Sequence, residues 1–264
     1  MNPPLPLDGF DTFPFTADGT TRTVYTRGSG RGVVVMHEIP GITPQVAAFA
    51  QRVADDGIRV YMPHLFGVPG KALSTGYMLG EVARACVRRE FAVLAAHRAS
   101  PLTEWLRALC RTAHAECGGS GVGALGMCIT GNFALALMVD EAVMAPVLSQ
   151  PSLPFGMTAG RRAALHVSDA QLAVIKRRAG DGCPVLGLRF TADPMCPGAR
   201  FATLRHELGQ NFEGIEIDSS PGNAHGIPRS AHSVLTTDLV DVDGHPTRTA
   251  LDRVLAFFHQ QLRA

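Results

Sequence analysis

Short apolar runs alternate along the chain with longer amphipathic segments. The apolar runs predict buried strands at residues 33–37, 58–62, 122–127, 143–148, 184–190 and 214–218. The amphipathic segments predict helices at residues 44–56, 77–98, 101–116, 133–138, 169–179, 197–208 and 247–262. Strands that alternate with helices predict an α/β fold, with a mostly parallel central sheet and helices on both faces.

The start of the chain follows another pattern. Residues 10–26 predict a β-hairpin whose turn is formed by Ala17, Asp18 and Gly19, so residues 1–30 are expected to extend the sheet at its N-terminal side. Stretches rich in Gly and Pro at residues 67–75 and 149–160 predict loops. The sequence shows no repeat, linker or domain break, and we expect residues 1–264 to form one domain.

Composition narrows the class of protein. The chain has 264 residues, of which 46% are hydrophobic and 18% charged, and this suits a large buried core. Its net charge of +1 gives no electrostatic reason to expect nucleic acid or an anionic membrane as a partner. The N-terminus lacks the pattern of a signal peptide, and no apolar stretch approaches the roughly 20 residues that span a bilayer. The six cysteines form no C-x-x-C pair, so we expect a reduced, cytoplasmic protein. We expect it to be a monomer or a weak homodimer.

The segment around Cys128 carries the strongest chemical signal. Cys128 lies between a predicted strand and a predicted helix, with Gly126 two residues before it and Gly131 three residues after it. This is the layout of a nucleophile elbow, in which a sharp turn exposes a nucleophile above the sheet. A lone cysteine is more often a small core residue, but the two glycines favour the functional interpretation. The backbone N–H of Ile129 would then form half of an oxyanion hole.

A thiol nucleophile needs a base, and the base needs an acid to orient it. Asp193 follows the strand that ends at Phe190, and His225 follows the strand that ends at Asp218. Nucleophile, acid and histidine therefore occur in the chain order of α/β-hydrolases. Asp193 could instead cap the next helix. His225 competes with His206, His232 and His245; it is preferred because it comes soonest after the last strand, and His232 is the second choice.

Glu38 follows a wholly apolar strand and is expected at the same edge of the sheet. Burial there would raise the pKa of its carboxyl group, although a solvated loop glutamate fits the sequence equally well. The backbone N–H of Ile39 is the expected second donor to the oxyanion.

Five motifs together resemble the dienelactone hydrolase family of α/β-hydrolases. They are His37-Glu-Ile-Pro-Gly41, Tyr61-Met-Pro-His-Leu-Phe-Gly67, Gly126-Met-Cys-Ile-Thr-Gly131, Asp193-Pro-Met-Cys-Pro197 and His225-Gly-Ile-Pro-Arg229. The resemblance covers the chain from Val33 to the last helix, and it implies a triad of Cys128, His225 and Asp193. It also implies that Glu38 lies beside the thiol and helps to ionise it, and that Arg229 binds a carboxylate of the substrate. The planar fork of an arginine suits that last role, whereas a surface arginine is the alternative.

The sequence departs from the family pattern in two places. Thr130 stands where the family usually has glycine, and a β-branched residue tightens the turn. Lys71 is the only cation near the position where a second substrate-binding arginine is expected, and a lysine cannot reproduce the bidentate clamp.

We therefore expect a hydrolase that cleaves a lactone or carboxylic ester, which could be anionic, through an acyl-enzyme on Cys128. No metal or organic cofactor is expected, because no metal-ligand spacing occurs among the histidines and cysteines. One alternative is a broad carboxylesterase or thioesterase on the same scaffold. A non-catalytic α/β binding protein is the other, and the complete set of Cys128, Asp193, His225 and Glu38 argues against it.

Overall fold

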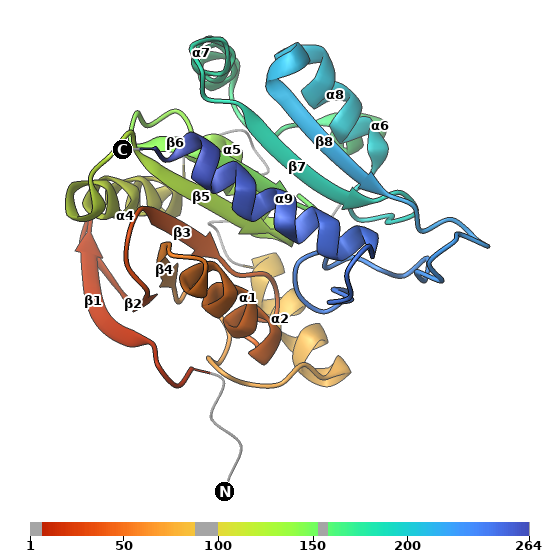
Figure 1. Ribbon diagram of the computed structural model, residues 1–264, viewed down its shortest axis with the longest axis horizontal. Coiled ribbons are helices and arrows are strands. Elements are labelled where there is room, and N and C mark those ends of the chain that lie inside the picture. Colours follow the sequence, from red (N-terminus) through yellow and green to blue (C-terminus); the bar gives the residue numbers. More distant parts are fainter. Residues whose placement is uncertain (1–6, 88–99, 153–157, 264) are drawn as a thin grey trace, which may run out of the picture.

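A computed structural model describes residues 7–87, 100–152 and 158–263 of the chain, with the side chains of residues 82–87, 159 and 161 left out. Its eight strands form one sheet in the order β1-β2-β4-β3-β5-β6-β7-β8. The pairs β1–β2 and β2–β4 are antiparallel, and all the other neighbours are parallel. The prediction of an α/β fold with a mostly parallel sheet is confirmed (Figure 1).

The strands lie close to their predicted positions. Their bounds are Asp11–Ala17 (β1), Thr20–Arg27 (β2), Gly32–Met36 (β3), Arg59–Pro63 (β4), Val122–Met127 (β5), Val143–Ser149 (β6), Val185–Phe190 (β7) and Phe212–Ile217 (β8). The predicted hairpin is β1 and β2, and its turn residues Asp18 and Gly19 both have positive φ, as a tight hairpin turn requires. The hairpin joins the sheet through the pairing of β2 with β4.

The helices also follow the sequence pattern. They are Pro44–Asp55 (α1), Thr75–Val87 (α2), Pro101–Cys117 (α4), Gly131–Leu137 (α5), Ala159–Ala163 (α6), Asp169–Gly180 (α7), Gly198–Leu208 (α8) and Pro246–Gln261 (α9). Thr43, Ser100 and Ser168 cap α1, α4 and α7 by accepting a bond from a backbone N–H of the first turn. The sequence did not predict the short helix α6, and the end of the helix predicted over 77–98 lies outside the described residues. None of the described helices is long and apolar enough to span a bilayer.

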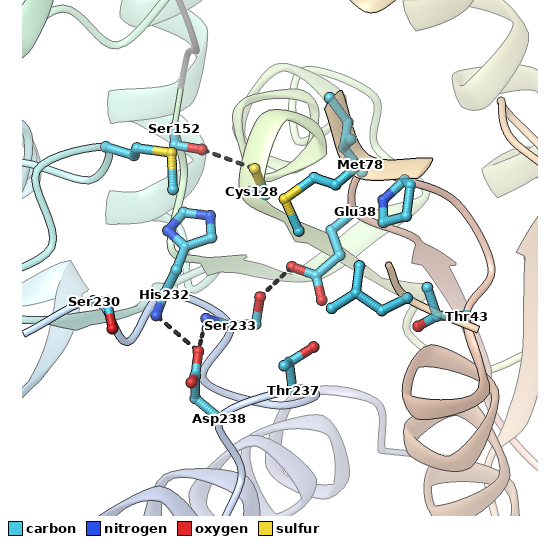
Figure 2. Close-up of a pocket in the computed structure, with 14 residues that line it drawn as sticks. Glu38, Thr43, Met78, Cys128, Ser152, Ser230, His232, Ser233, Thr237 and Asp238 are labelled. Carbon is cyan, nitrogen blue, oxygen red and sulfur yellow. Dashed lines mark hydrogen bonds between the residues drawn. The ribbon is translucent and has the colours of Figure 1, made fainter. Parts of the chain in front are cut away.

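The carboxyl ends of the parallel strands open on one edge of the sheet. Met127 at the end of β5 pairs with Ser149 at the end of β6, and Phe190 pairs with Ile217 at the ends of β7 and β8. The loops that follow these strands therefore start side by side, and Figure 2 shows the residues that they bring together.

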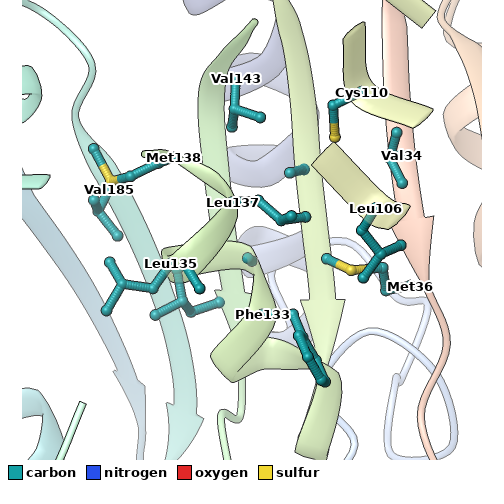
Figure 3. Packing of buried hydrophobic residues seen from close by; sticks show 14 of the residues in the cluster. Val34, Met36, Leu106, Cys110, Phe133, Leu135, Leu137, Met138, Val143 and Val185 are labelled. Carbon is teal, nitrogen blue, oxygen red and sulfur yellow. The ribbon is translucent and has the colours of Figure 1, made fainter. Parts of the chain in front are cut away.

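Two apolar layers hold the sheet between the helices. Side chains alternate along β3, so that Val33 and Val35 pack under α1 and α9, whereas Val34 and Met36 pack under α4 and α5. Figure 3 shows the second layer, in which Leu106 and Cys110 of α4 meet Phe133 and Leu137 of α5. Burying each such aliphatic or aromatic side chain stabilises the fold by about 1.5–3 kcal/mol. The packing on the two faces of the sheet therefore holds the strands that carry the loops.

Candidate active site

Cys128 occupies the turn between β5 and α5, as the sequence predicted. Its φ of 55° is in the left-handed region, which is strained for a residue with a side chain and is typical of a nucleophile elbow. Glycine is required at positions 126 and 131, because a side chain at either position would collide with nearby backbone atoms. A Cβ on Gly126 would lie 2.1 Å from the carbonyl oxygen of Thr130, and a Cβ on Gly131 would lie 2.9 Å from Cα of Pro151. The half-buried thiol side chain faces the cavity described below.

Thr130, the departure from the family pattern, has a structural role in this turn. Its hydroxyl accepts a bond from the backbone N–H of Met127 at 2.9 Å. The same oxygen lies 2.9 Å from the carbonyl of Met36 and 3.2 Å from that of His37. The hydroxyl oxygen also lies 2.8 Å from the carbonyl of Met127, so it is within hydrogen-bond distance of both the elbow and the end of β3.

His232 is the histidine that lies beside Asp193. Its Nδ1 donates to Oδ2 of Asp193 at 2.7 Å, and its ring points toward Cys128 (Figure 2). Its Nε2 atom is buried and has no hydrogen-bond partner among the residues that the structure describes. A buried ring nitrogen that faces a thiol and lacks any other partner is placed to take up the thiol proton.

The prediction of His225 as the partner of Asp193 is wrong. Asn223 accepts bonds from the backbone N–H groups of His225 and Ile227 and so closes a local turn. In that turn His225 is exposed, and its ring packs against His245 with 5.3 Å between the ring centroids. The chain reaches the carboxyl edge of the sheet seven residues later, at His232, which was the second choice from the sequence.

The surroundings of His232 favour its protonated form. Burial lowers the pKa of the imidazole, but the charge of Cys128 and the hydrogen bond to Asp193 outweigh it, and the net pKa lies well above 6.5. A histidine with this environment retains a proton delivered by the thiol. The imidazole of His232 is therefore a suitable acceptor for the thiol proton.

Asp193 is fixed by its own loop. It is 3% exposed, and its Oδ1 accepts a bond from the backbone N–H of Met195 at 2.9 Å. Arg189, buried at the end of β7, donates to the carbonyls of Thr191 and Cys196 at 2.9 and 2.8 Å and so holds both sides of the loop. Cys196 itself lies in the apolar core, where burial raises the pKa of its thiol to about 12. It is therefore a packing residue.

Glu38 is buried, and its carboxylate binds the loop that carries His232. Its Oε2 accepts from Ser233 Oγ at 2.7 Å and from Gln150 Nε2 at 3.2 Å, and its Oε1 accepts from Thr236 Oγ1. Each oxygen is thus engaged away from the sulfur. The sequence correctly located Glu38 at this edge of the sheet; its expected role in ionising the thiol stays a prediction.

The carboxylate of Asp238 also binds the loop that carries His232. Oδ2 of Asp238 accepts bonds from the backbone N–H groups of His232 and Ser233, both at 2.8 Å. His232 is therefore held at three points, since Asp193 binds its ring, Asp238 binds its backbone and Glu38 binds the next side chain.

A cavity of about 290 Å³ lies over these groups (Figure 2). Its wall combines the polar groups already described with several apolar side chains. The lining residues are Glu38, Ile39, Pro40, Thr43, Leu73, Met78, Cys128, Ser152, Met195, Ser230, His232, Ser233, Thr237 and Asp238. No Lys or Arg occurs among the described residues that line it.

The two cations predicted to bind a substrate carboxylate are outside this wall. Arg229 is exposed on the surface. Lys71 is also exposed, and its ammonium group lies 4.3 Å from the centroid of the Tyr77 ring. The described residues thus show no cation that could clamp an anion in the cavity. They also contain no cluster of three His, Cys, Asp or Glu side chains that could hold a metal ion.

Ser152 is a site residue that was not predicted from the sequence. This residue follows β6 and lines the cavity, and its Oγ lies 3.0 Å from Sγ of Cys128. Its position in a loop after a parallel strand is the signal that identified Asp193, and it could have identified Ser152 in the same way.

The sheet, the turn at Cys128 and the order of the loops define an α/β-hydrolase. The sequence matches the profile of the dienelactone hydrolase family over residues 21–262, and the chain belongs to that family. No curated protein matches the sequence.

Solved structures show the same fold at low sequence identity. A candidate dienelactone hydrolase from Klebsiella pneumoniae is 19% identical, with a TM-score of 0.62 over 95% of this chain and 98% of the other. A dienelactone hydrolase-like promiscuous phosphotriesterase, P91, from metagenomic libraries is 17% identical, with a TM-score of 0.57 over 96% and 98%. Est1E from Butyrivibrio proteoclasticus is 12% identical, with a TM-score of 0.56 over 95% and 98%.

Proposed function

We propose that the protein is a carboxylic ester hydrolase in which Cys128 is the nucleophile, His232 the base and Asp193 the orienting acid. The observation that carries this proposal is the imidazole of His232, which binds Asp193 through Nδ1 and presents an unpartnered, buried Nε2 toward the thiol. Membership of the dienelactone hydrolase family supports the same class of reaction.

The reaction proceeds in two steps. The thiol proton of Cys128 moves to Nε2 of His232, and the thiolate attacks the ester carbonyl to form a tetrahedral intermediate. The backbone N–H groups of Ile39 and Ile129 are the proposed donors to its oxyanion. The imidazolium gives its proton to the leaving alcohol as the C–O bond breaks, which leaves a thioester. Water that loses a proton to His232 then cleaves the thioester and releases the acid.

The cavity favours a substrate with a neutral, apolar acyl group. Ile39, Pro40, Leu73, Met78 and Met195 supply apolar surface beside the thiol. Glu38 adds a buried carboxylate that would repel an anionic substrate. This combination favours the broad carboxylesterase over a lactonase specific for anions, and a thioesterase would use the same groups.

The first test is hydrolysis of 4-nitrophenyl acetate and butyrate by the wild type and by Cys128→Ala. We expect a burst of nitrophenolate and an acylated Cys128 peptide in mass spectra of the wild type only. Folding of the variant is checked by its circular dichroism. Full turnover by a folded Cys128→Ala protein would reject Cys128 as the nucleophile, whereas a wild type that hydrolyses neither ester would favour the non-catalytic binding protein.

Substrate charge is tested separately. We expect kcat/KM for neutral esters to exceed that for esters with a carboxylate on the acyl chain. Arg229→Ala and Lys71→Ala are expected to leave this ratio unchanged, because neither side chain lines the cavity. A preference for the anionic ester that Arg229→Ala abolishes would instead support the dienelactone-type substrate.

A further inference from the structure

The side chain of Ser152 contacts the sulfur of Cys128. Its Oγ lies 3.0 Å from Sγ of Cys128, and its side chain points at the sulfur (Figure 2). The residue is 1% exposed, so the hydroxyl is shielded from water. A buried hydroxyl needs a partner, and among the described residues this sulfur is the partner that Ser152 has.

The backbone around Ser152 is fixed by several bonds. The N–H of Ser152 donates to the carbonyl of Cys128 at 3.0 Å, and Nδ2 of Asn132 donates to the carbonyl of Ser152 at 2.8 Å. The guanidinium of Arg200, 2% exposed, donates to the preceding carbonyl of Pro151. A buried arginine and a buried asparagine thus hold the segment that presents the hydroxyl to the sulfur.

Chemistry sets the direction of the bond between the two side chains. A neutral thiol can donate or accept, and so can a hydroxyl. When the thiol proton moves to Nε2 of His232, the sulfur keeps the electron pair of the broken S–H bond and can only accept. The hydroxyl of Ser152 then donates to it, and a hydrogen bond to an anion is stronger than one between neutral groups.

From this geometry we propose that Ser152 is a catalytic residue, whose hydroxyl donates a hydrogen bond to the Cys128 thiolate and so favours the ionised thiolate–imidazolium pair. The hydroxyl keeps its own proton throughout. This inference rests on the proposed role of Cys128 as nucleophile, but it concerns the resting enzyme and needs no substrate.

The other titratable and charged groups around the sulfur stay the same when Ser152 is replaced, so the effect of the hydroxyl can be isolated. They come from four elements: Glu38 after β3, Asp193 and Cys196 after β7, Arg200 on α8, and His232 and Asp238 after β8.

The test is the rate of alkylation of Cys128 by iodoacetamide as a function of pH, with the labelled peptide identified by mass spectrometry. We expect the midpoint of the profile to rise by about one pH unit or more in Ser152→Ala, which is a loss of roughly tenfold in rate below both midpoints. Ser220→Ala, an exposed serine, is the matched control and is expected to leave the profile unchanged.

A second pair of variants guards against a folding defect in Ser152→Ala. Threonine and valine have nearly the same shape, and only threonine carries the hydroxyl. Ser152→Thr is expected to keep a lower midpoint than Ser152→Val. An equal or lower midpoint in the variants without the hydroxyl would overturn the proposal.

Ester hydrolysis separates this result from a failure of the proposed function. If Cys128→Ala still hydrolyses esters, the proposed function fails, whatever the alkylation profile of Ser152→Ala. If Cys128→Ala is inactive and the alkylation midpoint does not depend on the hydroxyl, the role of Ser152 alone fails.

Discussion

His232 Nδ1 lies 2.7 Å from Oδ2 of Asp193, although the two residues are 39 positions apart in the chain. The bond joins the loop after β7 to the loop after β8, and it fixes both the tautomer and the orientation of the imidazole. With Nδ1 protonated, Nε2 is the atom that is free to accept a proton from Cys128. The bond therefore decides which nitrogen does the chemistry.

Asp193→Asn is expected to lower kcat for a neutral ester by roughly 10³–10⁴-fold, because an amide at this position permits the wrong tautomer of His232. Stopped-flow or steady-state assays with 4-nitrophenyl esters measure this. Asp243→Asn, at a side chain that is 97% exposed, is the control and should match the wild type. Equal activity of Asp193→Asn and the control would remove Asp193 from the site.

The two competing histidines give a sharp comparison. His232→Gln is expected to reduce kcat by about 10²–10⁴-fold, since it removes the general base. His225→Gln is expected to stay near the wild-type value, because the His225 ring packs on His245 outside the cavity. The assignment would be reversed if His225→Gln were the inactive variant.

The pKa of His232 should depend on the charge of its neighbour. In Cys128→Ala the burial that lowers this pKa remains, whereas the sulfur that raises it is gone. We therefore expect the imidazole to lose its proton at a lower pH than in the wild type. NMR titration of the ring protons measures the change, with Cys117→Ala as the control. An unchanged or higher pKa in Cys128→Ala would show that the sulfur does not act on the ring.

How much of this site the sequence predicts depends on how far apart in the chain the contacting residues are. Cys128 and Asp193 were predicted because each directly follows a strand, and the sheet carries such residues to a common edge. His225 is the first histidine after β8, but Asn223 folds its segment into a local turn. Proximity to a strand in the sequence therefore selected the wrong histidine.

The contacts of Glu38 lie beyond the reach of sequence patterns. Its partners Ser233 and Thr236 are 195 and 198 residues away, and no periodicity or motif links them. The strands and most of the described helices, in contrast, depend on local alternation of apolar and polar residues, and this is why they lie within a few residues of their predicted positions.

Glu38→Ala should destabilise the protein, because it leaves buried hydroxyl donors without their charged acceptor. We expect a loss of about 2–3 kcal/mol in the free energy of unfolding and a fall in Tm of about 4–10 °C. Urea unfolding followed by fluorescence measures the first quantity. In a double-mutant cycle, Ser233→Ala should cost less when it is added to Glu38→Ala than when it is made in the wild type. Additive costs would mean that the two side chains do not interact.

Gly126→Ala is expected to destabilise the fold by about 3 kcal/mol or more, since the added Cβ would lie 2.1 Å from the carbonyl oxygen of Thr130. Gly180→Ala at the end of α7 is the control, because a Cβ there has no neighbour within 4 Å. The midpoint of urea unfolding compares the two. Similar midpoints would show that the turn relaxes to accept a side chain.

The hydroxyl of Thr130 couples the supports of Ile39 and Ile129, the two proposed oxyanion donors. Its oxygen lies within hydrogen-bond distance of the carbonyls of Met36, His37 and Met127, so the hydroxyl sits between the two backbone segments that carry these donors. Accommodation of esters of different size is therefore expected from the lining residues Leu73 and Met78, which belong to another part of the chain.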